Sequence, residues 1–470
     1  MHLIFLAPIP FDSLHQRPQK LAEGFVRETL RVTYVEPSGI REYLDGRRRG
    51  LIGALARSLL YHARALTAMA AHPRRGENER GRRYRPGGGT PAEAVIPSSM
   101  AGRDSGGIGQ SVAQPAVPGR VPADSGRSIP HPAADPGDRP GVELATMPLV
   151  IPPNRVNSAF FERLAAAVYR EFLIREVYTG AAPGEKPVTL VEHPLYGEAL
   201  PGDEITGPVY YDCIDDLALY AGRAELSRYV TYQRRLVERS TAIFVTARRL
   251  EGQIRPMAGA RPLVRIPNGV DAAWFIEKAA GAVRPQALTG VPGPVAGYIG
   301  MLYSWIDYEL LAAAARSLPK VTFVLVGPIV DPERAAALRS LPNVLFPGRV
   351  PYTEVPAFVA SFDVCLIPFR KGPIADTTNP VKVFEYFALG KPVLSTQVAE
   401  LEPFAGEGLL RMAGGEEFVK VLGEMVREMQ PRAGNSGGTT VAQRRRAVAF
   451  DHSWQVHVRH MLNVMAQRGR

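Results

Sequence analysis

Short β-prone runs and longer helical stretches alternate along most of this sequence. In the first half, strand-like runs cover residues 3–7, 32–35, 142–151, 188–191, 209–211 and 242–246, and helical stretches cover 18–28, 158–177 and 224–239. In the second half, strand-like runs cover residues 295–299, 321–326, 344–346, 364–367 and 393–396. Such alternation is typical of parallel, doubly wound sheets with helices on both faces. It predicts an α/β fold.

The length of the chain, 470 residues, exceeds what one hydrophobic core usually supports. We therefore expect two Rossmann-like domains that face a central cleft and are joined near residues 272–292. The predicted boundaries are 1–275 for the first domain, 290–440 for the second, and 441–470 for a C-terminal helix that returns to the first domain. In open α/β sheets, ligands bind beyond the carboxyl ends of the strands.

Residues 73–140 differ in composition from the rest of the chain. They contain 23 Pro and Gly residues and no Leu, Phe or Trp. Such a segment buries too little apolar surface to offset the entropy of ordering its backbone. We expect a disordered insertion in the first domain that carries no chemistry.

A predicted helix start near Asn379 groups several residues suited to a sugar nucleotide. Asn379 can cap the helix and Pro380 suits its first position, so free N–H groups and the positive end of the helix dipole meet there. A phosphate would sit well at such a place. Lys382 and Glu385 share one helix face and supply a cation for a diphosphate and a carboxylate for a ribose diol. Gly390 is predicted to end the helix.

An ordinary amphipathic helix is the alternative for this segment. Val383, Phe384 and Phe387 would face a core, and Lys382 and Glu385 would form a common surface pair. The motif alone does not decide between the two interpretations.

Three further candidate residues follow predicted strands. His15 lies in the loop after the first strand and is a candidate catalytic residue, the alternative being an incidental loop histidine. His193 has the same position after a later strand. Gly300 ends the first strand of the second domain, where the absence of a side chain lets a backbone approach phosphates closely.

A group of carboxylates follows the strand at 209–211. Asp212, Asp215 and Asp216 are close enough in sequence to raise one another's pKa. Asp215 is therefore a candidate base. Capping of the next helix explains these residues equally well.

The composition indicates in which compartment the protein is expected. Cys213 and Cys365 lie in apolar strand-like runs, which favours buried free thiols in a reducing cytoplasm over a disulfide or a zinc site. No run is long enough to span a membrane, and residues 1–8 lack the length and basic flank of a signal peptide. We expect a cytoplasmic protein.

The net charge of +10 is concentrated in residues 41–85, which hold twelve arginines against four acids. Within them, residues 47–72 combine Arg47, Arg48 and Arg49 with an apolar helical stripe. This pattern fits a basic helix on an anionic membrane surface, and equally a helix packed on its own domain. No nucleic-acid motif accompanies the charge, so we expect no nucleic-acid partner.

Several strings resemble those of one enzyme family, the retaining GT-B glycosyltransferases of group 1, and within it the enzymes of teichuronic acid and exopolysaccharide synthesis. The strings cover residues 14–19 (LHQRPQ), 210–216 (YYDCIDD), 266–271 (IPNGVD), 297–300 (GYIG), 305–309 (WIDYE), 324–328 (VLVGP) and 379–393 (NPVKVFEYFALGKPV). The resemblance spans residues 1–72 and about 142–400.

The resemblance implies that the second domain binds a nucleotide-sugar donor. By position, the residues implied in donor binding are Gly300, Arg349, Val350, Asp376, Thr378, Asn379, Lys382 and Glu385. It also implies retention of configuration, with the leaving phosphate taking the acceptor proton and Lys382 stabilising the departing charge. No metal or other cofactor is expected, the nucleotide sugar being a substrate.

The sequence departs from the family pattern at two places. Thr377 stands where the first of two family glutamates is usual, with Asp376 as the nearest carboxylate. Met301, Leu302, Tyr303 and Ser304 occupy a loop that usually holds cations for the diphosphate. Of the contacts that the resemblance implies, the one to the donor sugar is most affected by these departures.

The predicted function is transfer of a sugar from a UDP- or GDP-sugar to a glycan or lipid-linked acceptor in bacterial surface polysaccharide synthesis. The expected location is the cytoplasm, with peripheral attachment at the inner membrane face. A sugar-nucleotide epimerase of similar fold and a catalytically decayed sugar-nucleotide binding protein are the alternatives.

Overall fold

The computed structural model describes residues 1–8, 16–37, 60–67, 69, 141–148, 159–203, 205–216, 219, 223–428 and 440–468. The insertion predicted at 73–140 and the candidate residue His15 lie outside these ranges, as does most of the basic segment 47–72.

The first domain is built on a seven-stranded parallel sheet with the order β3-β2-β1-β4-β5-β6-β7. The strands are β1 (His2–Leu6), β2 (Arg31–Glu36), β3 (Val142–Thr146), β4 (Val188–Val191), β5 (Val209–Cys213), β6 (Ala242–Val245) and β7 (Leu263–Arg265). Their side chains are mostly buried, because helices cover both faces. The predicted doubly wound sheet is confirmed, with the short strand β7 added at one edge.

The helices of this domain are α1 (Arg17–Arg27), α5 (Ala159–Phe172), α6 (Pro194–Ala199), α7 (Arg223–Arg239) and α8 (Arg248–Ala258). On one face of the sheet, Leu21 and Phe25 of α1 join a core with Phe5 and Tyr210. On the other face, α5, α6, α7 and α8 cover a second core. The helix predicted at 158–177 consists of α5 and a following π-helical turn at Leu173–Val177.

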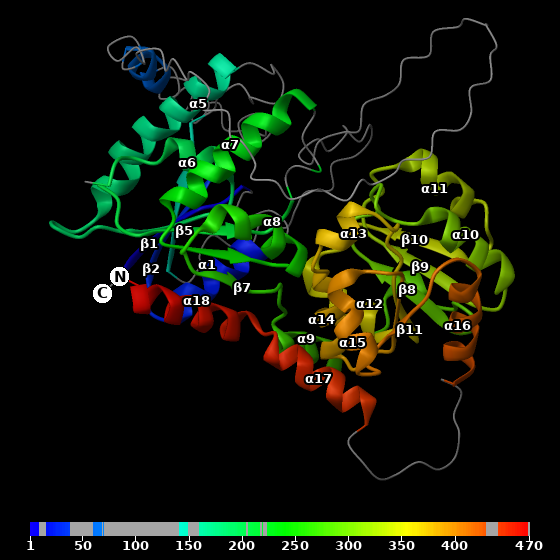
Figure 1. Ribbon diagram of the computed structural model, residues 1–470. Helices are drawn as coiled ribbons and strands as arrows, with labels where there is room; N and C mark the ends of the chain where they lie inside the picture. The colour runs from blue at the N-terminus through cyan, green and yellow to red at the C-terminus, as the bar shows by residue number, and fades with distance from the viewer. Residues whose placement is uncertain are drawn as a thin grey trace, which may run out of the picture.

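The second domain has a six-stranded parallel sheet with the order β10-β9-β8-β11-β12-β13. The strands are β8 (Val295–Ile299), β9 (Thr322–Val326), β10 (Val344–Gly348), β11 (Val364–Ile367), β12 (Val393–Ser395) and β13 (Arg411–Met412). The helices are α9 (Ala272–Ala280), α10 (Tyr308–Ser317), α11 (Pro332–Arg339), α12 (Val355–Ala360), α13 (Pro373–Thr377), α14 (Val381–Ala388), α15 (Glu402–Gly406) and α16 (Gly415–Glu428). Figure 1 shows the two α/β units side by side.

The chain crosses to the second domain just before α9. Val270, Ala272 and Phe275 belong to the hydrophobic core of the second domain. The chain therefore packs with the second domain from Val270 onward.

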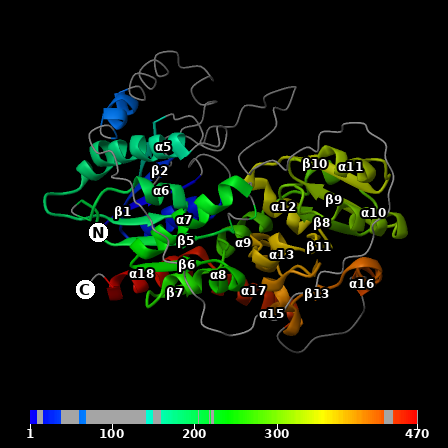
Figure 2. The ribbon, with the colours of Figure 1, turned by 45° about the horizontal axis from the view of Figure 1, so that its top comes forward.

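The last two helices connect the domains. Helix α17 (Val441–Asp451) lies against α14, and α18 (Trp454–Arg468) lies against α1, where Val458, Met461 and Met465 complete a core of the first domain. Figure 2 shows this segment running from the second domain back along the first. At the bend between the helices, the N–H of Val270 donates to the carbonyl of His452 at 3.1 Å.

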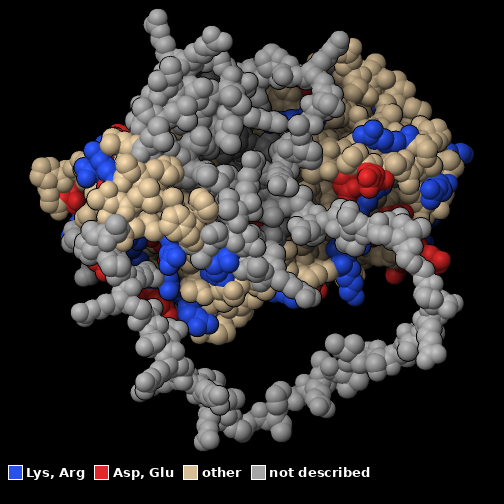
Figure 3. All heavy atoms as spheres, turned by 90° about the horizontal axis from the view of Figure 1, so that it is seen from above, with Lys and Arg blue, Asp and Glu red and all other residues tan. Residues whose placement is uncertain are grey.

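Charged side chains are spread over the described part of the face seen in Figure 3. In Figure 3, Lys and Arg lie over both domains with Asp and Glu among them, so the described part of this face has no large area of one sign. Among the described residues, no helix combines the length and the apolar character that a membrane span requires.

Candidate donor site and the contacts between the domains

Helix α14 begins one residue later than the sequence predicted. Its N-cap is Pro380, with no capping side chain, so the expectation that Asn379 caps the helix is wrong. Asn379 is 6 % exposed, and its side-chain oxygen instead accepts a hydrogen bond from the N–H of Asn268 at 3.0 Å. In the first turn of α14, the N–H of Val383 donates to the carbonyl of Pro380 at 3.2 Å, which leaves the N–H groups of Val381 and Lys382 as the candidates for a ligand.

Helix α14 is followed by Gly390 in the left-handed conformation, as the sequence predicted. Gly390 adopts φ +69°, its N–H donates to the carbonyl of Phe387, and the N–H of Lys391 donates to that of Tyr386. These two bonds form a Schellman motif, which requires the left-handed conformation that glycine adopts without strain.

Lys382 and Glu385 form the predicted pair on one face of α14. Nζ of Lys382 lies 3.2 Å from Oε2 of Glu385, and the carboxylate is only 1 % exposed. Oε1 of Glu385 accepts a hydrogen bond from the hydroxyl of Tyr352 at 3.2 Å, whereas Oε2 has no hydrogen-bond donor of good geometry among the described residues. Burial and the nearby Glu385 raise the pKa of Tyr352 well above its ordinary value, so the tyrosine remains a donor.

Gly300 lies beside this pair at the end of β8. A methyl group at Gly300 would come within 3.3 Å of Cε of Lys382. One turn further along α14, the hydroxyl of Tyr386 accepts a hydrogen bond from the N–H of Ile299 at 3.2 Å. This bond fixes α14 against the carboxyl end of β8, where the fold rule places a ligand.

The loop after β10 borders the same place. Arg349 is exposed and Val350 is partly buried, and Tyr352 follows them. The ring of Tyr352 stacks on Trp274 of α9, with centroids 5.3 Å apart and planes 3° apart. Nζ of Lys20, on α1 of the first domain, lies 5.8 Å from the centroid of the Tyr352 ring. The loop after β10, whose Tyr352 bonds Glu385, is therefore in contact with the first domain.

Three candidate residues precede α14. Asp376 forms an ion pair with Arg249 of α8 in the first domain, at 2.7 Å. The hydroxyl groups of Thr377 and Thr378 donate to the backbone carbonyls of Pro373 and Ile374 in α13. The hydroxyl that replaces the usual acid thus bonds its own helix, and Asp376 bonds the other domain.

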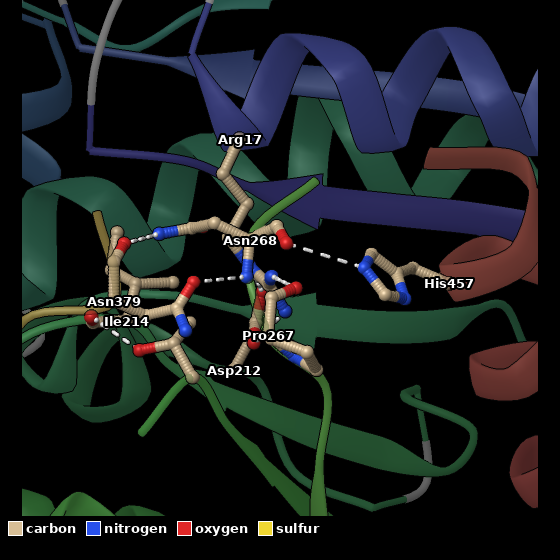
Figure 4. A network of polar contacts seen from close by, with 8 residues as sticks. Arg17, Asp212, Ile214, Pro267, Asn268, Asn379 and His457 are labelled. Carbon is tan, nitrogen blue, oxygen red and sulfur yellow. Dashed lines mark hydrogen bonds and ion pairs between the residues drawn. The ribbon is translucent and has the colours of Figure 1, made fainter. Parts of the chain in front are cut away.

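A network of polar contacts joins the two domains behind these residues (Figure 4). The side-chain amide of Asn268 donates to the carbonyl of Asn379 at 2.8 Å, which completes a reciprocal pair between the domains. The carbonyl of Asn268 accepts from Nε2 of His457 on α18 at 3.3 Å. Burial lowers the pKa of His457 to about 3, so the ring is neutral at pH 7.

Arg17 continues this network into the first domain. Its guanidinium donates to both carboxylate oxygens of Asp212, at 2.8 and 2.9 Å, and to the carbonyl of Pro267 at 3.0 Å. Arg17 is 4 % exposed and Asp212 is fully buried. Asp212 is thus half of a bidentate ion pair inside β5.

The other acidic candidates lie after β5. Burial, together with Asp216, raises the pKa of Asp215 to about 6. Asp216 accepts a hydrogen bond from the side chain of Gln253 at 2.8 Å. His193 caps α6 by accepting the N–H of Leu195, and burial lowers its pKa to about 4. No contact of the described residues joins Asp215 to α14.

Sequence reasoning missed four residues of this region, namely Arg17, Asn268, Tyr352 and His457. Arg17 and Asn268 stand inside strings that were singled out, but their partners are distant in sequence. Among the described residues, no group of three or more His, Cys, Asp or Glu residues is arranged to hold a metal. Both cysteines are free and buried, as expected.

The sequence of the second domain matches a known family. Residues 293–426 match the family described as "Glycosyl transferases group 1". They form a group 1 glycosyltransferase domain. The chain is also 26 % identical, over 320 residues, to a protein of Bacillus subtilis (strain 168) named as a teichuronic acid biosynthesis glycosyltransferase, TuaH. That alignment covers 64 % of this chain and 78 % of the relative.

Solved glycosyltransferase structures share the two-domain fold. Sucrose-phosphate synthase from Thermosynechococcus elongatus has a TM-score of 0.58 at 12 % identity and matches 99 % of this chain and 98 % of its own. Alr3699/HepE of Anabaena has a TM-score of 0.54 at 13 % identity, with 99 % and 100 % covered. These likenesses show that the chain has the GT-B fold, as its sequence predicted.

Proposed function

We propose that this glycosyltransferase transfers a sugar from a nucleoside diphosphate sugar to a glycan or lipid-linked acceptor in bacterial surface polysaccharide synthesis. The observation that carries the proposal is the Lys382–Glu385 pair at the start of α14, 3.2 Å apart and next to Gly300. The relative TuaH is named for teichuronic acid synthesis, and HepE is described in complex with UDP-glucose. The description of HepE supports a nucleotide-sugar donor, and the name of TuaH supports a role in polysaccharide synthesis.

In this proposal, the main requirement of the reaction is to stabilise the negative charge of the leaving group. When the anomeric C–O bond breaks, negative charge collects on the departing diphosphate. Lys382 and the N–H groups at the start of α14 would stabilise that charge without a metal ion. Glu385, whose Oε2 is in an ion pair with Lys382 but accepts no hydrogen bond from the described residues, would accept one from a ribose hydroxyl.

The proposed stereochemical course is retention. The leaving phosphate oxygen would take the acceptor proton on the face from which it departs, so no protein base is required. Asp215 and His193 lie in the first domain and are available only as acceptor contacts in this scheme. The proposed location is the cytoplasm, at the inner membrane face.

Incubation of the purified chain with UDP- and GDP-sugars tests the function. A transferase releases nucleoside diphosphate slowly by donor hydrolysis, an epimerase changes the sugar without release, and a decayed protein binds without turnover. Replacing Lys382 with Ala should weaken UDP binding roughly ten- to a hundred-fold, because a charge-assisted contact is lost.

Lys420→Ala is the matched control, because Lys420 is an exposed lysine on α16 in the same domain. It removes the same charge and should leave UDP affinity and release unchanged. Full affinity and turnover in Lys382→Ala would remove Lys382 from the site and contradict the proposal.

A further inference from the structure

The first domain contains a buried carboxyl group without a partner. Glu192 directly follows β4, and its N–H donates to the carbonyl of Leu6 at 3.1 Å. Its side chain is 3 % exposed, and neither carboxylate oxygen has a hydrogen-bond partner among the described residues. Burying a polar group in this way costs free energy, so natural proteins rarely do it without a ligand, a water or a function.

Glu192 lies at the topological switch point of the first sheet. From β1 the chain proceeds to β2 and β3 on one side, and then to β4 on the other side of β1. Open α/β sheets bind ligands where the strand order reverses, beyond the carboxyl ends of these strands. The second domain has the same arrangement at β8 and β11, and Gly300 of the candidate donor site lies there.

The charged neighbours of Glu192 make no hydrogen bond to its carboxyl group among the described residues. Because Val191 pairs with Tyr211, Glu192 is next to Asp212 on the adjacent strand. The positive charge of Arg17 favours the ionised form of Glu192, but the hydrogen bonds of its guanidinium go to Asp212 and to the carbonyl of Pro267. Burial and Asp212 raise the pKa of Glu192 well above its ordinary value.

A carboxyl group that keeps its proton offers one O–H donor and one carbonyl acceptor. This pair of groups matches a hydroxyl of a neutral sugar, which also donates and accepts. A phosphate is disfavoured here, because Asp212 and Asp215 lie close by and both contribute negative potential.

We propose that Glu192 anchors the acceptor substrate, through hydrogen bonds between its carboxyl group and a hydroxyl of a neutral sugar unit. The proposal rests on the sugar transfer argued above, and it places the second substrate at the switch point of the first domain. Glu192 is a binding residue in this scheme, and the donor site on α14 does not depend on it.

The test uses the full chain saturated with UDP. The probes are the methyl glycosides of glucose, galactose and N-acetylglucosamine, with glucosamine and glucose 6-phosphate as charged counterparts, and binding is measured by calorimetry. Wild type should bind at least one neutral glycoside. Glu192→Leu, which cannot hydrogen-bond, should bind it roughly ten-fold more weakly or not at all, while Glu192→Gln should retain most of the affinity.

Three further measurements separate function from folding. UDP affinity should be equal in all forms. The melting temperature of Glu192→Leu should equal or exceed that of wild type, because an unsatisfied carboxyl group is removed. Glu162→Gln is the matched control: this buried glutamate is bonded to Arg228 and Tyr232, so its replacement should lower the melting temperature and leave glycoside binding unchanged.

Several results would overturn the proposal. In the first, wild type binds UDP but no neutral glycoside. In the second, it binds only glucosamine or glucose 6-phosphate. In the third, Glu192→Leu binds the glycoside as tightly as wild type does. If that variant does not fold, Glu192→Asp replaces it, because withdrawing the carboxyl by one methylene must also weaken glycoside binding. If wild type binds GDP and not UDP, GDP replaces UDP in the test, and wild type that binds neither would instead contradict the proposed function.

Discussion

Glu385 is nearly excluded from solvent, yet only two described side chains satisfy its carboxylate. Lys382 reaches Oε2 and the hydroxyl of Tyr352 reaches Oε1. A bound sugar nucleotide would draw Lys382 toward the diphosphate, and Tyr352 would then hold the carboxylate in place alone. Tyr352 is in this sense a positioning residue for the donor site.

Replacing Tyr352 with Phe should lower UDP affinity about five-fold, because a hydrogen bond worth about 1 kcal/mol no longer orients Glu385. The ring, and with it the stack on Trp274, stays in place, so the melting temperature should change little. Glu385→Gln should reduce affinity for UDP itself, not only for the sugar. Calorimetry with UDP measures all forms.

Tyr61→Phe serves as the control for this prediction. It removes another tyrosine-to-glutamate hydrogen bond, the one to Glu176 at 2.6 Å in the first domain, and should leave UDP binding unchanged. Equal UDP affinity of wild type, Tyr352→Phe and Glu385→Gln would show that the carboxylate does not contact the nucleotide.

At the scale of elements, two loops with glycines pack against each other beside the candidate donor site. Gly300 after β8 and Gly327 after β9 approach so closely that a methyl group at Gly327 would lie 1.9 Å from the carbonyl oxygen of Gly300. Gly327 also adopts φ +139°, which other residues rarely adopt. The sequence pattern predicted a close approach to a ligand at Gly300, and the structure adds a close approach to another loop.

Gly327→Ala should therefore lower the free energy of unfolding by roughly 2–4 kcal/mol, from overlap and backbone strain together. It should also weaken UDP binding, because the loop at Gly300 must shift. Chemical denaturation and calorimetry measure the two effects.

Gly252→Ala is the control for that change. Gly252 lies inside α8 with nothing within 4 Å of the added methyl group, so this substitution should stabilise the chain by about 0.5–1 kcal/mol. If Gly327→Ala unfolds no more easily than wild type, the two loops do not constrain each other.

At the scale of the whole molecule, the two-sheet fold could be predicted from the sequence, but the contacts between distant segments could not. Apolar periodicity is local, so it predicted the long strands and missed β7 and β13, which have three and two residues. The Lys382–Glu385 pair was predictable because its members share one helix face. Arg17 and Asp212 are 195 positions apart, and only the folded sheet brings them together.

Membrane attachment is also a property of the whole molecule. In the described part of the basic segment, Tyr61 and Ala65 are buried, with Tyr61 packed edge-on against Phe172 of α5, while Leu60 and Leu66 are 47 % and 45 % exposed. Packing on the domain and an apolar outer face thus coexist. We expect wild type to sediment with anionic vesicles at low salt and much less above about 0.1 M, where charges are screened within about 10 Å.

Replacing Arg47, Arg48 and Arg49 with Gln should release the protein from these vesicles without changing UDP binding. A matched triple variant replaces Arg316, Lys320 and Arg339, three exposed cations of the second domain, with Gln and should still sediment. Equal sedimentation of all three proteins, or none at low salt, would make the segment an ordinary packed element.

The position of α18 has a consequence for biosynthesis. Val458, Met461 and Met465 close one face of the first sheet, but the ribosome makes them after the entire second domain. Until α18 has been synthesised, part of the apolar surface of this core stays exposed, including that of Leu21, Phe25 and Tyr210. The nascent protein cannot finish its domains in the order of synthesis, and the uncovered face is where a chaperone that binds apolar surface would act on it.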